Sequence, residues 1–434
     1  MKSRITIKYK GELFKKTDYL LIFLLLQIGI LLLLLNLRRL DLLLVPILFY
    51  ISYRRNQGKL FDTKFFILFL IFIFLATVQG VIFGSFSIIT IITSFSLICL
   101  VPYFLFKIYK SDFFFLFEKV VRVLVYISLI IWLLQQFVPG VKEIILSVIL
   151  LINKYNILDF PRFMFFYTYW PGLDQDFGLS RNAGFSNEPA AFSVIIILAI
   201  IINYARNIQM FDKRNLIYYL ALLSTFSTAG YIAFSVLGLL LLKQKRYRIL
   251  GVLLFPIFIF IASYAYKNLE FMQEKIEFQY SSAMEQDLNQ YTTGRIYGAR
   301  KSLLVLSKYP LTGRGLQART KPKEDDPEYA NYGWLAEMSK FGILFGALFM
   351  FYFLKGFKQF IEAGGHGFYE FAVCALSIMI ILTAQNGITN FIFMVFFFIG
   401  LYNYRNNYKP LQINRLKPRE STDILFRSAS SLKQ

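Results

Sequence analysis

The sequence predicts an all-α integral membrane protein that crosses the bilayer about twelve times. Hydrophobic residues make up 57% of the 434 residues, and charged residues only 17%, where an ordinary soluble domain has roughly 25%. The 49 Phe and 28 Tyr sit in long apolar runs such as LLIFLLLQIGILLLLLNL, which no water-soluble surface could cover. This composition excludes a soluble enzyme, a disordered chain and a secreted disulfide scaffold.

Twelve apolar segments have the composition of membrane-crossing helices. Such a helix needs about 20 apolar residues, and fewer where the bilayer is thinned around it. The second, seventh and eighth segments are short, and for this reason the count is given as about twelve. The segments cover residues 19–37, 40–53, 65–80, 84–106, 120–138, 189–205, 216–226, 229–242, 249–266, 334–354, 368–385 and 388–404.

The chain divides into two tails and one membrane domain. The first apolar run begins near Tyr19, is too long for the core of a signal peptide and lacks a small-residue cleavage site. We therefore expect it to remain in the membrane as the first span. The membrane domain is residues 19–404, between a basic tail at 1–18 and a basic, Ser-containing tail at 405–434.

The positive charges predict that both termini are cytoplasmic. The net charge of +21 could suggest a nucleic-acid partner, but Lys and Arg accumulate on the cytoplasmic side of membrane proteins, so none is expected. With both termini inside, the inside segments hold 30 of the 47 Lys and Arg. Basic clusters flank both ends of residues 216–242, so the polar sequence STFSTAG in their middle is predicted to be a turn between two helices.

Two long connections, at about residues 139–188 and 267–333, are expected on the outer face. The first opens with VKEIILSVILLIN, which is typical of a helix lying in the membrane interface, and continues with the aromatic run FPRFMFFYTYWPG. The second contains a predicted helix at Arg295–Lys308. Connections of this length usually carry function, and these are too apolar for disorder. The side chains expected together on one face of that helix are Ile296, Ala299, Leu303 and Leu306.

The second connection is rich in cations. Between Tyr291 and Lys323 there are eight cations and no acid, although acids precede and follow this stretch. The preference of Lys and Arg for the cytoplasmic side does not explain cations on the outer face. They indicate either an anionic ligand or attraction to lipid headgroups and to the flanking acids. Arg side chains are suited to phosphate oxygens in particular. The cations are Arg295, Arg300, Lys301, Lys308, Arg314, Arg319, Lys321 and Lys323.

A second constellation is RNAGFSNEPAAFS at residues 181–193. Pro189 stands where the first position of a helix should be, which puts Glu188 at its N-terminal cap. Glu188 and Arg181 are therefore expected at the outer mouth of the membrane domain. Two interpretations are open: Glu188 caps the helix and pairs with Arg181, or it acts as a catalytic carboxylate.

The sequence lacks residues that imidazole catalysis, metal binding and nucleotide binding would need. The single His, His366, falls in a connection expected on the cytoplasmic side, so no imidazole is available on the outer face. The acidic run at residues 324–326 is better explained as a solvated turn than as a metal site. No phosphate-binding loop or dinucleotide fingerprint occurs, which excludes an ATP-driven pump. Neither a metal nor a cofactor is expected.

Four segments, in order along the chain, carry a resemblance. RNAGFSNEPAAFS is similar to an Arg-x-x-Gly-x-Phe-x-Glu-Pro segment entering a helix, and TFSTAGYIAF to a Ser-Arg-Gly-Gly turn, with Thr228 where an Arg is common. GRIYGARKSLLVLSKYPLTGRG resembles an Arg, helix, Pro-Leu-Thr-Gly-x-Gly element, and NYGWLAEMSKFGILFG a His-Asn…Gly-x-x-Gly stretch. The chain thus resembles the O-antigen polymerase/ligase superfamily over about residues 181–346.

The resemblance implies a GT-C-like membrane glycosyltransferase that needs no metal or nucleotide. Such an enzyme transfers a glycan en bloc from undecaprenyl diphosphate to an acceptor sugar hydroxyl on the outer face of the bacterial inner membrane. It implies that Arg181 and Arg295 bind the donor diphosphate. It also implies that Arg300 and Arg314 assist them, that Glu188 orients or deprotonates the acceptor, and that Asn331 and Tyr332 contact sugar.

One departure from the family pattern favours a Wzy-type polymerase of lipid-linked oligosaccharide repeat units, because a ligase normally uses a His where this sequence has Asn331. A second departure, Thr228, removes one of the family's cations and leaves Arg181 and Arg295 as the cations that match family positions. A ligase on the same fold remains an alternative, as does a flippase or transporter of lipid-linked oligosaccharides. Membrane lipids and a protein that regulates chain length are further expected partners.

Overall fold

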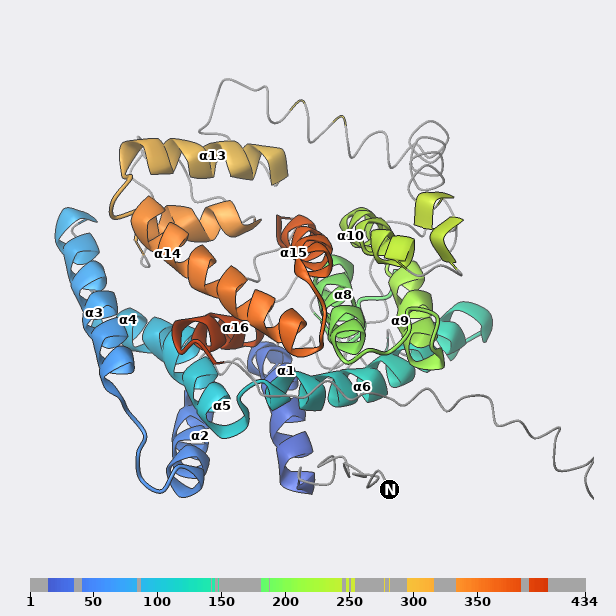
Figure 1. The fold of residues 1–434 in the computed structure, drawn as a ribbon, viewed down its shortest axis with the longest axis horizontal. Coiled ribbons are helices and arrows are strands. Elements are labelled where there is room, and N and C mark those ends of the chain that lie inside the picture. Colours follow the sequence, from blue (N-terminus) through green and yellow to red (C-terminus); the bar gives the residue numbers. More distant parts are fainter. Residues whose placement is uncertain are drawn as a thin grey trace, which may run out of the picture.

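A computed structural model of the chain shows an assembly of helices (Figure 1). The description covers residues 15–34, 41–83, 87–141, 143–144, 147, 181–186, 188–243, 247–249, 251–253, 277, 281, 295–315, 333–383 and 390–404. Within these residues the regular structure is helical and contains no strand, which confirms the all-α prediction. The helices are α1 (Lys16–Leu34), α2 (Asp41–Arg55), α3 (Thr63–Phe83), α4 (Ile88–Phe95), η2 (Ser96–Leu100), α5 (Val101–Tyr109), α6 (Asp112–Phe137), α8 (Pro189–Ala205), α9 (Lys213–Ser224), α10 (Thr228–Gly238), η3 (Leu239–Lys243), α13 (Arg295–Lys308), α14 (Gly333–Ala363), α15 (Phe368–Thr383) and α16 (Phe391–Leu401).

Three helical segments of the described chain are long and apolar enough to cross a membrane: α3, the continuous run Ile88–Tyr109, and α14. Four more apolar helices are shorter, at Pro189–Ala205, Thr228–Lys243, Phe368–Thr383 and Phe391–Leu401. The structure therefore agrees with a membrane protein, and the count of about twelve spans stays a prediction. Most of the ninth predicted span, of the first long connection and of both tails lies outside the described residues.

The run Ile88–Tyr109 is continuous but not uniform. Its first part, α4, begins at Ser87, whose side chain accepts a hydrogen bond from the Thr90 N–H. Residues Ser96–Leu100 then form one π-helical turn, η2, before the α-helix resumes as α5. A π turn holds one residue more than an α turn, so it shifts the face that the rest of the helix presents.

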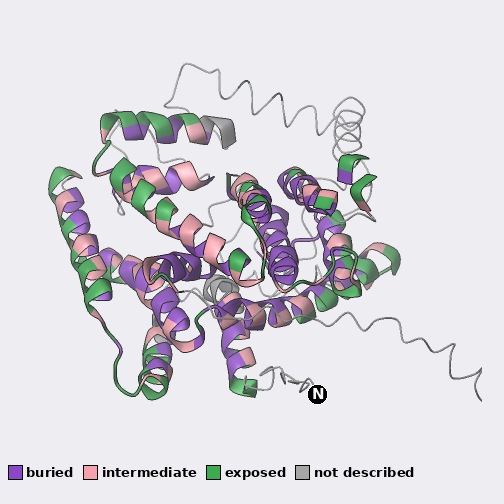
Figure 2. Cartoon of the chain, viewed as in Figure 1, coloured by how far each residue is buried: buried purple, intermediate pink, exposed green. Residues whose placement is uncertain are grey.

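How far a residue is buried depends on where its helix lies in the assembly (Figure 2). α8 is apolar on all sides and nearly every one of its residues is buried, as in a helix surrounded by others. α16 is buried along most of its length in the same way. α3 and α6 instead expose large apolar side chains, among them Phe74 at 68% and Phe137 at 71% exposed, as expected where a helix faces lipid.

α14 and α16 cross each other through two glycines. A Cβ at Gly356 would stand 1.8 Å from the Phe396 carbonyl oxygen, and one at Gly400 would stand 2.0 Å from that of Tyr352. Small residues at such a crossing let the two backbones approach closely, which is the usual basis of helix association where the surroundings are apolar. Around the crossing, the rings of Phe114 and Phe396 stack with centroids 3.9 Å apart.

Ion pairs join helix ends in one polar layer. Asp18, in the first turn of α1, binds Arg55 at the end of α2 at 2.7 Å and accepts a hydrogen bond from Tyr109 at the end of α5. The buried Glu118 near the start of α6 binds Arg122 at 2.9 Å and lies 3.5 Å from Arg206, which follows α8. These pairs fix the order in which the helix ends meet at this layer.

The same layer anchors α3 and α16 through Asp62. Its carboxylate binds Lys107 of α5 at 2.9 Å and accepts hydrogen bonds from the Tyr402 hydroxyl, which follows α16, and from the Phe65 N–H. Desolvation raises the pKa of Asp62, but the hydrogen bonds and the Lys107 charge together lower it below its ordinary value. A carboxyl with a lowered folded-state pKa stabilises the fold above its unfolded pKa, and that stability is lost as the pH falls through the folded pKa.

We therefore expect Asp62→Asn to reduce stability near pH 7 by about 1 kcal/mol, because it leaves Lys107 without its counter-charge. The melting temperature of the detergent-purified protein, followed from near pH 7 to below the ordinary Asp pKa of 3.8, measures this effect. The difference between wild type and variant should disappear at the acidic end of this range. A difference that persists there would show that the carboxylate charge is not what stabilises the layer; Glu362→Gln, at an exposed helix position, is the control.

Candidate functional site

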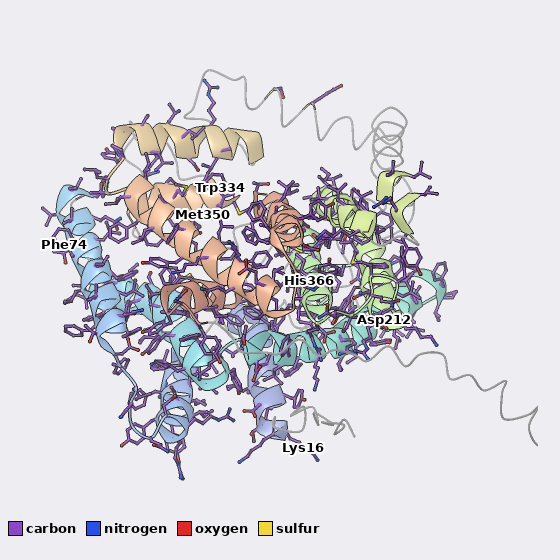
Figure 3. All side chains as sticks on the ribbon, in the orientation of Figure 1. Lys16, Phe74, Asp212, Trp334, Met350 and His366 are labelled. Atoms are coloured by element: carbon purple, nitrogen blue, oxygen red, sulfur yellow. The ribbon has the colours of Figure 1, made fainter. Side chains whose placement is uncertain are left out.

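Two polar assemblies interrupt the apolar core away from the ion-pair layer. α8 ends in that layer at Arg206, so its start at Pro189 lies about 25 Å away along the helix. The first assembly, the Asn182 cluster, is the segment Arg181–Ser186 with the turn between α9 and α10. The second, the α14 break, joins residues 309–315 to the interrupted first part of α14. Figure 3 shows Trp334, at the start of α14, on the opposite side of the molecule from Lys16 at the start of α1.

Asn182 is the centre of the first assembly. It is fully buried, its amide nitrogen donates to the Ser224 hydroxyl at 3.0 Å, and its amide oxygen accepts from the Ser128 hydroxyl at 2.9 Å. The same oxygen accepts from the Gly184 N–H at 2.8 Å, and the Asn182 backbone N–H donates to the Ser224 carbonyl oxygen. One side chain thus joins α6, the end of α9 and the segment that leads into α8.

Arg181 binds the turn itself. Its guanidinium donates from Nε to the Thr225 carbonyl oxygen and from Nη2 to that of Phe226, each at 3.1 Å. Phe226 has a φ of +46°, a left-handed conformation that is unfavourable for a non-glycine residue. The predicted turn at STFSTAG is thereby confirmed, since α9 ends at Ser224 and Ser227 caps α10 by accepting from the Gly230 N–H. Two of the Arg181 donors are therefore engaged in holding the backbone of this turn.

Glu188 takes the N-cap position of α8, as predicted, but not the capping role. Its backbone is extended, with φ −158° and ψ 157°, and its side chain makes no capping hydrogen bond to the helix. Among the described residues its half-buried carboxylate has no hydrogen-bond or ion-pair partner, so the interpretation of Glu188 as a capping group paired with Arg181 is wrong. Within the described part of the chain, the carboxylate oxygens are thus open to accept a hydrogen bond.

The second assembly forms where α14 is broken. Gly342 has a φ of +83° and a ψ of 167°, values outside the helical region, so the helical ladder stops there. The carbonyl oxygens of Ser339 and Lys340 instead accept from the N–H groups of Arg314 and Gly315, at 2.8 and 3.1 Å. The 309–315 segment thus replaces the hydrogen-bond partners that the helix itself lacks at the break.

Gln79 joins α3 to the same break. It is buried near the end of α3, and its amide nitrogen donates to the carbonyl oxygens of Thr312 at 2.6 Å and Lys340 at 2.9 Å. One turn before the break, Glu337 binds Lys340 at 2.7 Å and stands at the edge of an apolar cavity between α3 and α14. The carboxylate of Glu337, the amide of Gln79 and the ammonium group of Lys340 therefore lie near the point where the helical hydrogen bonds of α14 are interrupted.

The described cations of the second connection do not share one surface. α13 forms over the predicted range, but its buried face is Gly298, Lys301, Ser302, Val305 and Leu306, whereas Leu303 is 54% exposed. Leu306 of the predicted face is buried, but Leu303 is not, because a stripe rotated around the helix packs on α14 instead; the side chain of Ile296 is not among those described. Arg300 is exposed, and Arg314 is buried at the α14 break.

The remaining predicted residues are placed only in part. Arg295 is the first residue of α13, and its side chain is not among those described; Asn331 and Tyr332 lie outside the described residues. His366 lies in the connection between α14 and α15, where its Nε2 contacts the Tyr204 carbonyl oxygen at 2.9 Å. Within the described part of the chain no group of His, Cys, Asp and Glu side chains could hold a metal ion.

No protein-family model, curated protein or solved structure matches this chain. The site is therefore defined by its own geometry. Sequence reasoning missed Asn182, Gln79 and Gly342. For Gln79 there was a signal, because it is the one strongly polar residue of the apolar helix α3 after its first turn.

The Asn182 cluster predicts a graded loss of stability. Asn182→Ala should destabilise the protein by about 2–4 kcal/mol, because it leaves the buried Ser128 hydroxyl and Gly184 N–H without their acceptor. Ser224→Ala removes a single partner and should cost only about 1 kcal/mol. Thermal unfolding of both variants in detergent measures the difference, and equal losses would show that Asn182 is not the centre of the cluster.

The α14 break predicts that Gly342 cannot be replaced. A Cβ there would stand 2.3 Å from the Leu311 carbonyl oxygen, in a backbone conformation that favours glycine, so Gly342→Ala should cost about 3 kcal/mol or more. Gly140 has the same φ of +83°, but a Cβ added there would meet open space. Gly140→Ala therefore measures the part of the stability loss that comes from backbone conformation alone, about 1 kcal/mol. Thermal unfolding compares the two variants. Equal stability losses would contradict the close approach between the 309–315 segment and α14.

Proposed function

We propose that this protein is a polymerase of lipid-linked oligosaccharide repeat units, of the Wzy type. The observation that carries the proposal is the half-buried carboxylate of Glu188, which has no partner among the described residues although it stands at the start of a buried apolar helix. A carboxylate with open hydrogen-bonding capacity at such a position is suited to bind a hydroxyl group. It is the residue that the resemblance implies for the acceptor sugar.

The chemistry needs only a base and a place for the leaving group. The Glu188 carboxylate takes the proton from the acceptor hydroxyl while that oxygen forms a bond to the anomeric carbon of the donor sugar. The bond from this carbon to the diphosphate oxygen breaks, and the lipid diphosphate leaves with the electron pair. No nucleotide or metal enters the reaction, because the donor's own sugar–phosphate bond supplies the driving force.

The leaving diphosphate needs positive charge, since negative charge develops on it in the transition state. Arg181 and Arg295 are the proposed partners of this group, assisted by Arg300 and Arg314. Arg181 also holds the turn after α9, and in this way it positions the segment that leads to Glu188. Asn331 and Tyr332 are proposed to contact sugar.

The proposal includes the finer topology. It places about twelve spans in a GT-C-like arrangement in the bacterial inner membrane, with both termini cytoplasmic and two loops closing over a cleft on the outer face. The all-α structure and its apolar helices are compatible with this arrangement. The substrates are undecaprenyl-diphosphate-linked oligosaccharides as donor and acceptor.

The test is reconstitution of the purified protein with an undecaprenyl-diphosphate-linked repeat unit, without nucleotide or metal, read on a gel. A ladder of longer lipid-linked glycans is expected. Glu188→Gln should reduce the rate of ladder formation at least about 100-fold, the usual contribution of a general base, while leaving thermal stability unchanged. Asp212→Asn, at the start of α9, is a control of the same chemistry far from Glu188 along the bundle. Wild-type chain lengths from Glu188→Gln would refute the role of Glu188.

One observation favours a second candidate, a flippase or transporter of lipid-linked oligosaccharides. Broken helices that bear charged groups are common at transporter substrate sites, and α14 has both a break at Gly342 and the Glu337–Lys340 pair beside it. The leaflet in which single repeat units accumulate in deletion cells separates the candidates. Accumulation on the outer leaflet supports the polymerase, and accumulation on the inner leaflet supports the flippase.

A further inference from the structure

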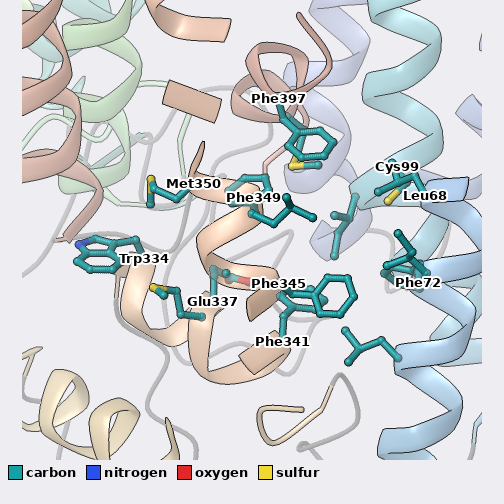
Figure 4. A pocket seen from close by; sticks show the side chains of 17 residues that line it. Leu68, Phe72, Cys99, Trp334, Glu337, Phe341, Phe345, Phe349, Met350 and Phe397 are labelled. Atoms are coloured by element: carbon teal, nitrogen blue, oxygen red, sulfur yellow. The ribbon is translucent and has the colours of Figure 1, made fainter. Parts of the chain in front are cut away.

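The interior of the bundle contains apolar and polar places that the side chains around them do not complete. The apolar one is a cavity of about 100 Å³ between α3, α14 and α16, lined by aliphatic, aromatic and sulfur-containing side chains apart from Glu337 (Figure 4). Walls of this kind favour no particular ligand. The polar place lies in the ion-pair layer, where α6 meets the end of α8, and its groups are more selective.

Arg206 is a buried cation whose partners are incomplete. It directly follows α8, and its side chain is 12% exposed. Its Nη1 atom lies 3.5 Å from the nearer carboxylate oxygen of Glu118, and its guanidinium lies over the Phe115 ring, with Cζ 5.0 Å from the ring centroid. Neither Nε nor Nη1 has a hydrogen-bond acceptor in the described structure, although both atoms are shielded from solvent. Buried N–H groups of a cation that lack acceptors are costly.

The Glu118 carboxylate is already committed to other groups. It is fully buried, and its Oε1 accepts from the Tyr218 hydroxyl while its Oε2 accepts from Arg122 Nη2, each at 2.9 Å. Among the described residues neither Arg122 nor Arg206 has a second acidic partner. These four residues, the Glu118 cluster, therefore combine two positive charges with one negative charge inside the bundle.

A water molecule is not a sufficient partner for Arg206. Water can accept from Nε–H, but it leaves the positive charge of the Glu118 cluster in place, whereas a monovalent anion meets both needs. One turn earlier on α8, the fully buried Asn203 has an Oδ1 atom without a donor, and there water is the fitting partner, because an anion cannot donate. Since Nε and Nη1 are shielded from solvent, the space beside them suits a small ion better than a lipid headgroup.

We infer that Arg206 binds a small monovalent inorganic anion, of the class of chloride, in the Glu118 cluster. The bound anion completes the contacts between α6 and the end of α8. A divalent anion would exchange the single positive charge for a single negative one. The site is separate from Glu188 and does not depend on the proposed function.

The test follows thermal unfolding of the full-length protein in detergent. Sodium chloride replaces sodium gluconate stepwise at a constant ionic strength of about 0.15 M, where gluconate is the background anion that is too large for the site. The melting temperature should rise with chloride along a saturating curve. At 100 times the dissociation constant, an anion that binds only the folded protein raises the ratio of folded to unfolded protein about 100-fold. Bromide should act in the same way, and in crystals its anomalous scattering should appear beside Arg206 Nε.

Three variants show whether the charge of Arg206 is responsible. Arg206→Gln should abolish the chloride-dependent shift. Glu118→Gln should lower the dissociation constant at least about tenfold, because it removes the negative charge 3.5 Å from Nη1, and it provides a second variant if the first does not fold. Arg214→Gln is the matched control, since this arginine of α9 is exposed and pairs with the exposed Asp212; its chloride-dependent shift should equal that of wild type.

Three results would overturn the inference. Equal melting temperatures of the wild type in chloride and in gluconate would mean that only water meets the N–H groups of Arg206. A chloride-dependent shift that survives in Arg206→Gln would place the anion elsewhere. A dissociation constant that Glu118→Gln leaves unchanged would show that the charge of the Glu118 cluster does not govern binding.

Discussion

The structure depends on one constraint: a helix that breaks among apolar side chains must find other partners for its backbone. At Gly342 the ladder of α14 stops, and the carbonyl oxygens of Ser339 and Lys340 turn to the 309–315 segment and to Gln79. An unsatisfied backbone group in such surroundings costs several kcal/mol, so these contacts are obligatory. They decide where the segment after α13 runs and where α3 is held.

Both polar assemblies satisfy hydrogen-bonding groups inside the apolar core, but they use different groups to do so. In the Asn182 cluster a buried amide satisfies hydroxyl and backbone groups from α6, α9 and the segment before α8. At the α14 break, backbone N–H groups satisfy most of the exposed carbonyl oxygens. Glycine at positions 313 and 342 allows the 309–315 segment and α14 to touch.

Much of the helix arrangement, though less of the site, was predictable from the sequence. The start of α8 at Pro189, the bounds of α13 and the turn before Thr228 follow from local signals: a proline, an amphipathic period and a polar break. The face of α13 was not predictable, because the face that packs on α14 includes the polar side chains Lys301 and Ser302. The break at Gly342 was also hidden, since its cause is a close contact with Leu311, which is far away in sequence.

The π turn at Ser96–Leu100 has a consequence for how this chain can change in length. It contains one residue beyond what a regular helix needs, so a single deletion there would restore an unbroken α-helix while the residues on either side keep the faces that they present. Tyr103 and Lys107 would then keep their contacts with Leu60 and Asp62. A deletion inside a regular stretch of helix would instead turn everything after it by about 100°.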